Sequence, residues 1–231
     1  MTPSDALGAG YGGIFFDLDG TLVDTAPDMV AVLVAMQKDN GTQPVPYELA
    51  RASVSQGAMG LIKLGFPAAD EKERGRLHQD YMVRYEQAVC IGSTLFPGLL
   101  ELLDRLDKHQ RPWGVVTNKP ERMTIPLLEK LGLYGRISCA ISGDTLSQRK
   151  PHPAPLLLAC ERAGVTPAQS IYVGDDARDV LAGRAAGMTT IAAAYGYITA
   201  EDDPVLWEAD HIAGSTLELT KLILKAVRLE T

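Results

Sequence analysis

The stretch IFFDLDGTLVDT, residues 14–25, ends an apolar run on two carboxylates. Three apolar residues lead directly into Asp17 and Asp19, and Gly20 and Thr21 follow. A carboxylate costs free energy when it leaves water, and two close together cost more. A buried strand that ends on such a pair therefore indicates a site at which a bound cation and an anionic ligand complete the acids.

Short apolar runs alternate with helical patterns along most of the chain. The runs have the composition of strands buried on both faces, with a short edge strand last: residues 12–16, 113–117, 139–142, 170–174, 189–195 and 211–214. Apolar spacing and helix-end residues predict helices at 99–109, 126–133, 153–164, 179–187 and 215–227. This alternation predicts an α/β fold with a Rossmann-like parallel sheet and helices on both faces.

One interval interrupts the alternation. From Ala26 to Pro112 the chain runs for 87 residues without a convincing strand, whereas a βαβ unit needs only about 30. The interval has helical patterns at 26–39, 46–53, 57–65 and 69–89. We therefore predict a helical domain at residues 25–92, inserted into a core formed by residues 1–24 and 93–231.

The composition excludes several classes of protein. The net charge of −7 argues against binding to nucleic acid or to anionic membranes, because both need a basic surface. No apolar run reaches the ~18 residues of a membrane span, and the first residues do not have the pattern of a signal peptide. The three cysteines form no CxxC pair and predict neither a disulfide framework nor a zinc site. We expect a cytoplasmic enzyme without a nucleic-acid or membrane partner.

Polar residues follow four of the predicted strands at the point where each strand ends. They occupy residues 17–21, 117–119, 149–151 and 174–179, and they include acids, hydroxyls, an amide and cations. In an open parallel sheet, ligands bind at the carboxyl ends of the strands. The sequence therefore predicts one site at this edge of the sheet.

Two simpler interpretations of the acidic pair explain less. An EF-hand calcium loop beginning at Asp17 would need glycine at its sixth position, which is Leu22, and helices on both sides. A solvated acidic turn would not explain the buried run before it. It would also not explain the three further aspartates after the fourth strand, at positions 175, 176 and 179.

The acidic pair has the chemistry needed for phosphoryl transfer. A carboxylate at a strand end, here Asp17, can attack phosphorus and form an aspartyl-phosphate. Asp19 lies two residues on, projects to the same side, and can protonate the leaving oxygen and then deprotonate a water. The turn at Gly20 lets backbone N–H groups approach a phosphate. A Mg²⁺ ion would relieve the repulsion among the acids by bridging them to phosphate oxygens.

Other strand-end residues extend this site. The Thr117 hydroxyl can donate to a phosphate oxygen, although a β-branched residue in a strand accounts for it equally well. Lys150 can neutralise phosphate charge and hold the attacking carboxylate. Asp175 is the expected metal ligand of the last cluster, and Asp176 and Asp179 either bind through water or orient the other ligands. Simpler roles suffice for the two neighbouring arginines, Arg149 as a solvated residue and Arg178 as an ion-pair partner.

Four motifs resemble those of the haloacid dehalogenase-like hydrolase superfamily: DLDGT (17–21), VVTNK (115–119), KPHP (150–153) and GDDARD (174–179). They occur in the family's order, and the resemblance spans nearly the whole chain. It implies that Asp17 is the nucleophile, that Asp19 is the general acid and base, and that Thr117 and Lys150 bind phosphate. It also implies that Asp17, the backbone carbonyl of Asp19, and Asp175 hold Mg²⁺. The inserted helices resemble the family's cap, which closes over the site.

The resemblance also bears on the substrate. Asp19 implies phosphoryl transfer, because the dehalogenases of the superfamily attack carbon and do not use this second acid. The cap, TNKP and KPHP resemble the phosphoglycolate phosphatase group, which implies 2-phosphoglycolate. GDDARD departs from that group's GDS followed by an Asn-Asp pair. Together with residues 113–120 and 195–210, it resembles the N-acetylmuramic acid 6-phosphate phosphatases. A phosphosugar mutase of the β-phosphoglucomutase kind and a catalytically silent binding module are further alternatives.

The expected substrate contacts are Gly20, Thr21, Asn118 and Arg51. Arg51 lies in a predicted cap helix and can pair with a substrate carboxylate, although a solvated helix position explains it equally well. Both candidate substrates carry a carboxylate, so Arg51 does not distinguish them. The expected partner is a small phosphorylated metabolite, and the chain is expected to be a monomer or a homodimer.

Overall fold

The structure is a computed structural model that describes residues 10–229, and the first residues, for which the sequence predicts no signal peptide, lie outside this range. Its core is a parallel sheet in the order β5-β4-β1-β6-β7-β8. The strands are β1 (Gly13–Phe16), β4 (Trp113–Val116), β5 (Ala140–Ile141), β6 (Ser170–Gly174), β7 (Thr189–Ala193) and β8 (His211–Ala213). The predicted α/β fold is confirmed, and every strand except β6 is one or two residues shorter than expected.

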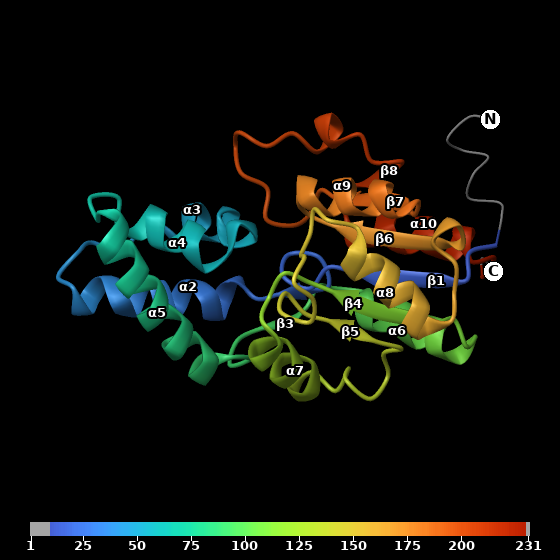
Figure 1. Ribbon diagram of the computed structural model, residues 1–231, viewed down its shortest axis with the longest axis horizontal. Helices are drawn as coiled ribbons and strands as arrows, with labels where there is room; N and C mark the ends of the chain where they lie inside the picture. Colours follow the sequence, from blue (N-terminus) through green and yellow to red (C-terminus); the bar gives the residue numbers. More distant parts are fainter. Residues whose placement is uncertain (1–9, 230–231) are drawn as a thin grey trace.

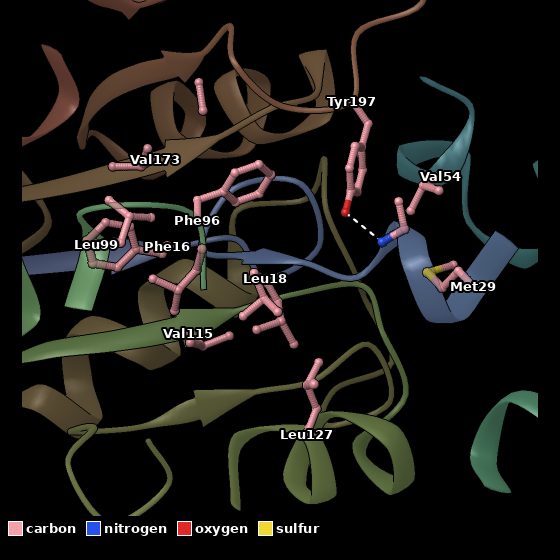
Figure 2. Close-up of a cluster of buried hydrophobic side chains, with 14 of the residues drawn as sticks. Phe16, Leu18, Met29, Val54, Phe96, Leu99, Val115, Leu127, Val173 and Tyr197 are labelled. Carbon is pink, nitrogen blue, oxygen red and sulfur yellow. Dashed lines mark hydrogen bonds between the residues drawn. The ribbon is translucent and has the colours of Figure 1, made fainter. Parts of the chain in front are cut away.

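Helices cover both faces of the sheet, as Figure 1 shows. One face packs against α6 (Leu99–Lys108) and α10 (Thr216–Ala226), and the other against α8 (Ala154–Ala163) and α9 (Ala177–Ala186). Side chains of β1 alternate between the faces: Phe16 packs with the α6 side, and Phe15 with the α8 side. In Figure 2 Phe16 lies beside Leu99 of α6. Within residues 10–229, no helix is both long and apolar enough to cross a membrane.

The helix predicted at 126–133 is observed as α7 (Glu121–Lys130), which begins five residues earlier. The apolar spacing of residues 126–133 predicts a helix over that range, but it does not mark the first turn. In the structure Pro126 lies inside the helix, and Pro120 precedes the first turn. Packing of Met123, Leu127 and related side chains in the core outweighs the backbone hydrogen bond that Pro126 cannot make.

The inserted segment forms a separate helical layer beyond the carboxyl ends of the strands (Figure 1). It comprises α2 (Ala26–Asp39), α3 (Tyr47–Ala52), the short 3₁₀ helix η2 (Val54–Gln56), α4 (Gly57–Gly65) and α5 (Glu71–Ala88). Helices α2, α4 and α5 pack against one another around buried residues such as Leu33, Leu61 and Tyr81. This arrangement supports our proposal that residues 25–92 are a cap domain.

Two short strands connect the cap to the core. β2 (Val23–Asp24) enters the cap and pairs antiparallel with β3 (Thr94–Leu95), which leaves it. The buried Asp28 carboxylate binds the exit chain, because it accepts hydrogen bonds from the N–H groups of residues 91–93 and from the Ser93 hydroxyl. We call this pair of connecting strands, β2 and β3, the hinge. Strands of two residues are too short to show a periodic pattern, so the sequence did not predict it.

Candidate active site

The turn after β1 places two acids at the edge of the sheet. Asp17 stays in register because its N–H donates to the carbonyl of Val173 in β6 at 2.8 Å. Leu18 is fully buried, and its carbonyl accepts the N–H groups of residues 22 and 23, which closes the turn. Gly20 has a φ of +80°, and a Cβ there would lie 2.1 Å from Asp175 Oδ2. The sequence DLDG therefore makes a turn that fits tightly against the end of β6.

Three carboxylates converge at this edge. Asp17, Asp175 and Asp179 each offer one oxygen, and these three oxygens lie within 4.8 Å of one another. Burial, together with the charges of Asp17 and Asp179, raises the pKa of Asp175 well above its ordinary value. An oxygen-only cluster of this charge suits a hard divalent cation such as Mg²⁺. The side chain of Asp19 is not in the cluster, and ligation by its backbone carbonyl stays a prediction.

Lys150 supplies the positive charge next to these acids. Its Nζ lies 2.8 Å from Asp17 Oδ1 and 2.6 Å from Asp179 Oδ1, and it donates to the hydroxyl of Tyr172 at 2.9 Å. Burial alone would lower the pKa of Lys150, but Asp17 and Asp179 outweigh burial and raise it. The lysine is therefore a permanent cation held against the expected nucleophile.

The last motif begins helix α9 and contributes two of these acids. Asp176 and Asp179 form a capping box, in which the carboxylate of each residue accepts a hydrogen bond from the backbone N–H of the other. The guanidinium of Arg178 pairs with Asp176 at 2.7 Å, as the sequence suggested. Burial raises the pKa of Asp179 to about 7, although the charge of Lys150 opposes the rise. Asp179 thus joins the acidic cluster, whereas the sequence favoured Asp175 as the ligand of this motif and left Asp179 to bind through water or to orient the other ligands.

Asp175 is held from three directions. Thr21 donates to its Oδ1 at 3.0 Å, and Ser55 donates to its Oδ2 at 2.7 Å. The backbone N–H of Tyr197 also donates to Oδ2, at 2.9 Å. Thr21 was predicted to contact substrate, but it is fully buried and does not line the cavity. Its hydroxyl orients the acid instead.

The residues after β4 face the same site. Thr117 is buried and lines the cavity, and its Oγ1 accepts the N–H of Lys119 at 3.1 Å. Asn118 also lines the cavity, but its side-chain amide pairs with both backbone groups of Lys150, at 3.0 and 3.1 Å. Asn118 thereby joins the β4 loop to the loop that carries Lys150.

A cavity of about 530 Å³ lies between the cap and the core. Asp17, Asp19, Thr117 and Lys150 line it from the core. The cap contributes mainly apolar groups, including Met29 and Val54, which Figure 2 shows on the cap side, together with Met59, Met82 and Tyr85. The cavity thus has a charged floor and a largely apolar roof, whose polar lining residues are Ser55, Gln56 and His78.

Cap and core also contact each other directly beside the cavity. Arg178 of α9 donates to the backbone carbonyl of Ser55 at 2.6 Å, and the hydroxyl of the same serine binds Asp175. Ser55 is therefore fixed by two core residues at once. No sequence pattern singled out this serine, because a single hydroxyl in a helical segment is a common surface residue.

Arg51 does not line the cavity. Its Nη2 lies 3.4 Å from Asp24 Oδ2 in the hinge, and its guanidinium lies 4.9 Å from the centre of the Tyr197 ring. The Tyr197 hydroxyl donates to Asp24 Oδ1 at 2.7 Å and accepts the N–H of Ala26 at 2.8 Å, the contact drawn dashed in Figure 2. Arg51 therefore belongs to a cluster at the hinge.

Several known proteins are similar to this chain over most of its length. Residues 14–193 match the family described as haloacid dehalogenase-like hydrolase. A phosphoglycolate phosphatase of Xanthomonas campestris pv. campestris is 44% identical over 197 residues, 85% of this chain and 89% of that protein. An N-acetylmuramic acid 6-phosphate phosphatase of Pseudomonas putida is 42% identical over 217 residues, 93% of this chain and 96% of that protein. A crystal structure described as a predicted phosphoglycolate phosphatase, from Haemophilus somnus, superposes with a TM-score of 0.81 at 28% identity, covering 92% of this chain and 98% of that one.

Proposed function

The chain belongs to the haloacid dehalogenase-like hydrolase family, and from this premise we propose that it is a Mg²⁺-dependent phosphatase acting through an aspartyl-phosphate. One observation carries the proposal. The Asp17 carboxylate at the end of β1 is paired with the Lys150 ammonium at 2.8 Å, and Asp19, two residues on, lines the same cavity. A nucleophile, a cation and a second acid thus meet where a phosphoester can enter.

The residues divide the reaction into two displacements. An Asp17 oxygen forms a bond to phosphorus while the ester oxygen leaves, and Asp19 gives that oxygen its proton, so that a neutral alcohol departs. Asp19, now a carboxylate, takes a proton from a water whose oxygen attacks the phosphorus. The aspartyl bond breaks, and inorganic phosphate and the original Asp17 carboxylate are released. Thr117 and Lys150 are the proposed ligands of the transferred group.

Asp17, Asp175 and Asp179 fit a bound Mg²⁺, because their oxygens converge and two of them have raised pKa values in the absence of a cation. When bound, Mg²⁺ would supply charge neutralisation for the phosphoryl oxygens. Lys150 balances only part of the negative charge, because the cluster holds three carboxylates and the ammonium pairs with two of them, Asp17 and Asp179. We propose Asp17, Asp175 and the carbonyl of Asp19 as ligands, with Asp179 either binding directly or orienting the others.

We expect Mg²⁺ to raise the melting temperature more at about pH 8 than at about pH 5. Asp179 has a pKa of about 7 in the folded protein and an ordinary value of 3.8. Between these values the folded state retains a proton that the unfolded state has lost, so without metal the free energy of unfolding falls as pH rises. Mg²⁺ replaces that proton, so it stabilises more once the carboxylates are ionised.

Thermal melts with and without millimolar MgCl₂ at the two pH values test this expectation. Asp175→Asn should lose most of the Mg²⁺-dependent rise. Asp202→Asn, which changes an exposed aspartate outside the cavity, should keep it. An equal rise at both pH values would contradict the assignment of the metal to this acidic cluster.

The cavity bears on which phosphoester is hydrolysed. Volumes of about 300–1,000 Å³ suit ligands of drug size, and this cavity of about 530 Å³ is in that range. The apolar roof formed by Met29, Val54, Met59 and Met82 has no counterpart on 2-phosphoglycolate, whereas the acetyl and lactyl methyl groups of N-acetylmuramic acid 6-phosphate can pack there. The TNKP and KPHP motifs favour phosphoglycolate, and the GDDARD motif favours the amino sugar. The cavity supports the phosphorylated amino sugar, which we propose as the better substrate.

Phosphate release with Mg²⁺ tests both levels of the proposal. We would compare kcat/KM for 2-phosphoglycolate and N-acetylmuramic acid 6-phosphate, and also follow each reaction for isomerised sugar phosphate. A preference of about tenfold or more for the amino sugar is expected. A preference for phosphoglycolate would overturn the substrate, and isomer without free phosphate would favour the mutase. Failure to release phosphate from any ester would overturn the phosphatase itself.

We expect Arg51→Ala to lower kcat/KM for every substrate by a similar factor, so that the factors for any two substrates agree within about twofold. Arg51 binds the hinge through Asp24 and Tyr197, so its loss costs about 1 kcal/mol of folding free energy. Arg51 has either a structural role beside Asp24 and Tyr197 or a role as ligand of the substrate carboxylate. Assays with 2-phosphoglycolate and with ethyl phosphate, which lacks the carboxylate, distinguish these two roles. A selective rise in KM for 2-phosphoglycolate would restore Arg51 as a substrate ligand. Arg84→Ala, which breaks ion pairs elsewhere on the cap, is the control.

A further inference from the structure

Lys119 is a buried cation that the reaction described above does not use. It follows Asn118 after β4, lines the cavity, and has a side chain only 4% exposed. Its Nζ donates to Asp19 Oδ1 at 2.9 Å, to Asp19 Oδ2 at 3.2 Å, and to the hydroxyl of Tyr85 at 2.8 Å. Tyr85 belongs to α5 of the cap, and its ring centre lies 4.5 Å from the same ammonium. One core lysine therefore connects the expected acid and base to the cap.

Three acceptor oxygens surround the Lys119 ammonium. A lysine Nζ carries three N–H bonds, and Asp19 and Tyr85 accept three hydrogen bonds from it. The Lys119 ammonium points at Asp19 and Tyr85, and the Lys150 ammonium pairs with Asp17. Lys119 is thus placed to act on Asp19 and not as a second phosphate ligand.

The same contacts orient the Asp19 carboxylate. Thr25 donates to Oδ1 at 2.6 Å, and Lys119 donates to that oxygen at 2.9 Å. Oδ2 has one longer contact, at 3.2 Å. Two strong donors on one oxygen restrain rotation of the carboxylate and leave the other oxygen more available to the ester oxygen of a bound substrate.

We propose that Lys119 is a positioning residue that holds Asp19 in place for proton transfer, and that Tyr85 completes this arrangement when the cap is closed. The inference rests on the proposed phosphatase function. It predicts that proton transfer to the leaving oxygen depends on a cap residue that donates no proton itself. Opening the cap removes Tyr85 from Lys119, so the acid is fully positioned only over an enclosed substrate.

Leaving-group dependence tests this role. Nitrophenolate leaves without protonation, whereas an alkyl alcohol needs the proton of Asp19. We expect Lys119→Met to slow alcohol release from ethyl phosphate by about 30-fold or more, and nitrophenolate release from p-nitrophenyl phosphate by less than about threefold. Single turnovers with enzyme in excess isolate the first displacement. Tyr85→Phe should show the same selectivity at about fivefold, and Lys119→Arg should recover most of the loss.

Two controls make the result specific. Lys130→Met removes an ammonium that also joins the core to the cap, through the carbonyl of Val89, but does not contact Asp19. It should leave both rates within about twofold. In an Asp19→Ala background, Lys119→Met should add less than about twofold, because a residue acting through Asp19 has nothing left to position.

The outcomes separate this inference from the function on which it rests. Equal losses with both esters, an unchanged alkyl rate, or a further tenfold loss in the Asp19→Ala background would each overturn the positioning role alone. Wild-type enzyme that releases neither alcohol with Mg²⁺ would overturn the phosphatase and the positioning role together.

Discussion

Asp17→Asn should lower kcat by at least about 10⁴-fold while the protein stays folded. An amide is a very weak nucleophile toward phosphorus. The other carboxylate after β1, Asp19, is assigned to proton transfer and does not replace Asp17 as the nucleophile. Asp17 is also paired with Lys150, so the substitution removes one acid from a crowded cluster and one partner from the ammonium. These two effects on stability oppose each other, and a small net change is expected.

Phosphate release at saturating substrate measures kcat, and unfolding in denaturant measures the free energy of unfolding. Asp202→Asn is the matched control, because it makes the same chemical change at an exposed position outside the cavity. It should leave kcat and the free energy of unfolding at their wild-type values. Turnover by Asp17→Asn within tenfold of wild type would remove Asp17 as the nucleophile and would leave the cluster as a metal site only.

Gly20→Ala should strongly damage both the stability and the activity of the protein. The residue has a φ of +80°, which costs an L-residue about 1–2 kcal/mol. Its Cβ would also lie 2.1 Å from Asp175 Oδ2 and 2.7 Å from the ring of Tyr197. Both neighbours are buried, so the turn or the acid has to shift. We expect a loss of about 3 kcal/mol or more in the free energy of unfolding and of about 100-fold in kcat/KM.

Gly132→Ala separates the cost of a positive φ from the cost of the close contacts that a Cβ at Gly20 would make. Gly132 has a φ of +69°, but a Cβ there meets nothing within 4 Å. This variant should lose only the backbone penalty of about 1 kcal/mol and keep wild-type activity. If Gly20→Ala lost no more free energy of unfolding than Gly132→Ala, the close approach of the turn to Asp175 would not contribute to stability.

Some site residues were predictable because their positions relative to strand ends are visible in the sequence. Parallel strands bring their carboxyl ends to one edge, so Asp17, Thr117, Lys150 and Asp175 were expected together, and the structure places them there. Asp179 was expected near the metal, and its oxygen joins the cluster. Their catalytic and ligand roles stay predictions until the variants are measured.

Other parts of the site depend on contacts that no local pattern records. Arg51 was a plausible substrate ligand because it lies in a cap helix, but the fold directs it to Asp24 and Tyr197. Ser55 approaches Asp175 only because the cap lies over the end of β6. Lys119 stands in a motif that the sequence singled out, yet its partner Tyr85 is 34 residues away on another domain. A single sequence contains no signal for such pairs.

The sequence by itself determined the parallel sheet, the inserted helices and the edge on which the acids gather. These features follow from local periodicity and from the rule that parallel strands share a direction, and both are legible in neighbouring residues. The tertiary structure alone decided how the cap meets the core, where Arg51 binds, and which cation holds Asp19. Those outcomes depend on packing between segments distant in the chain, where side chains compete for the same buried partners and only the folded geometry decides among them.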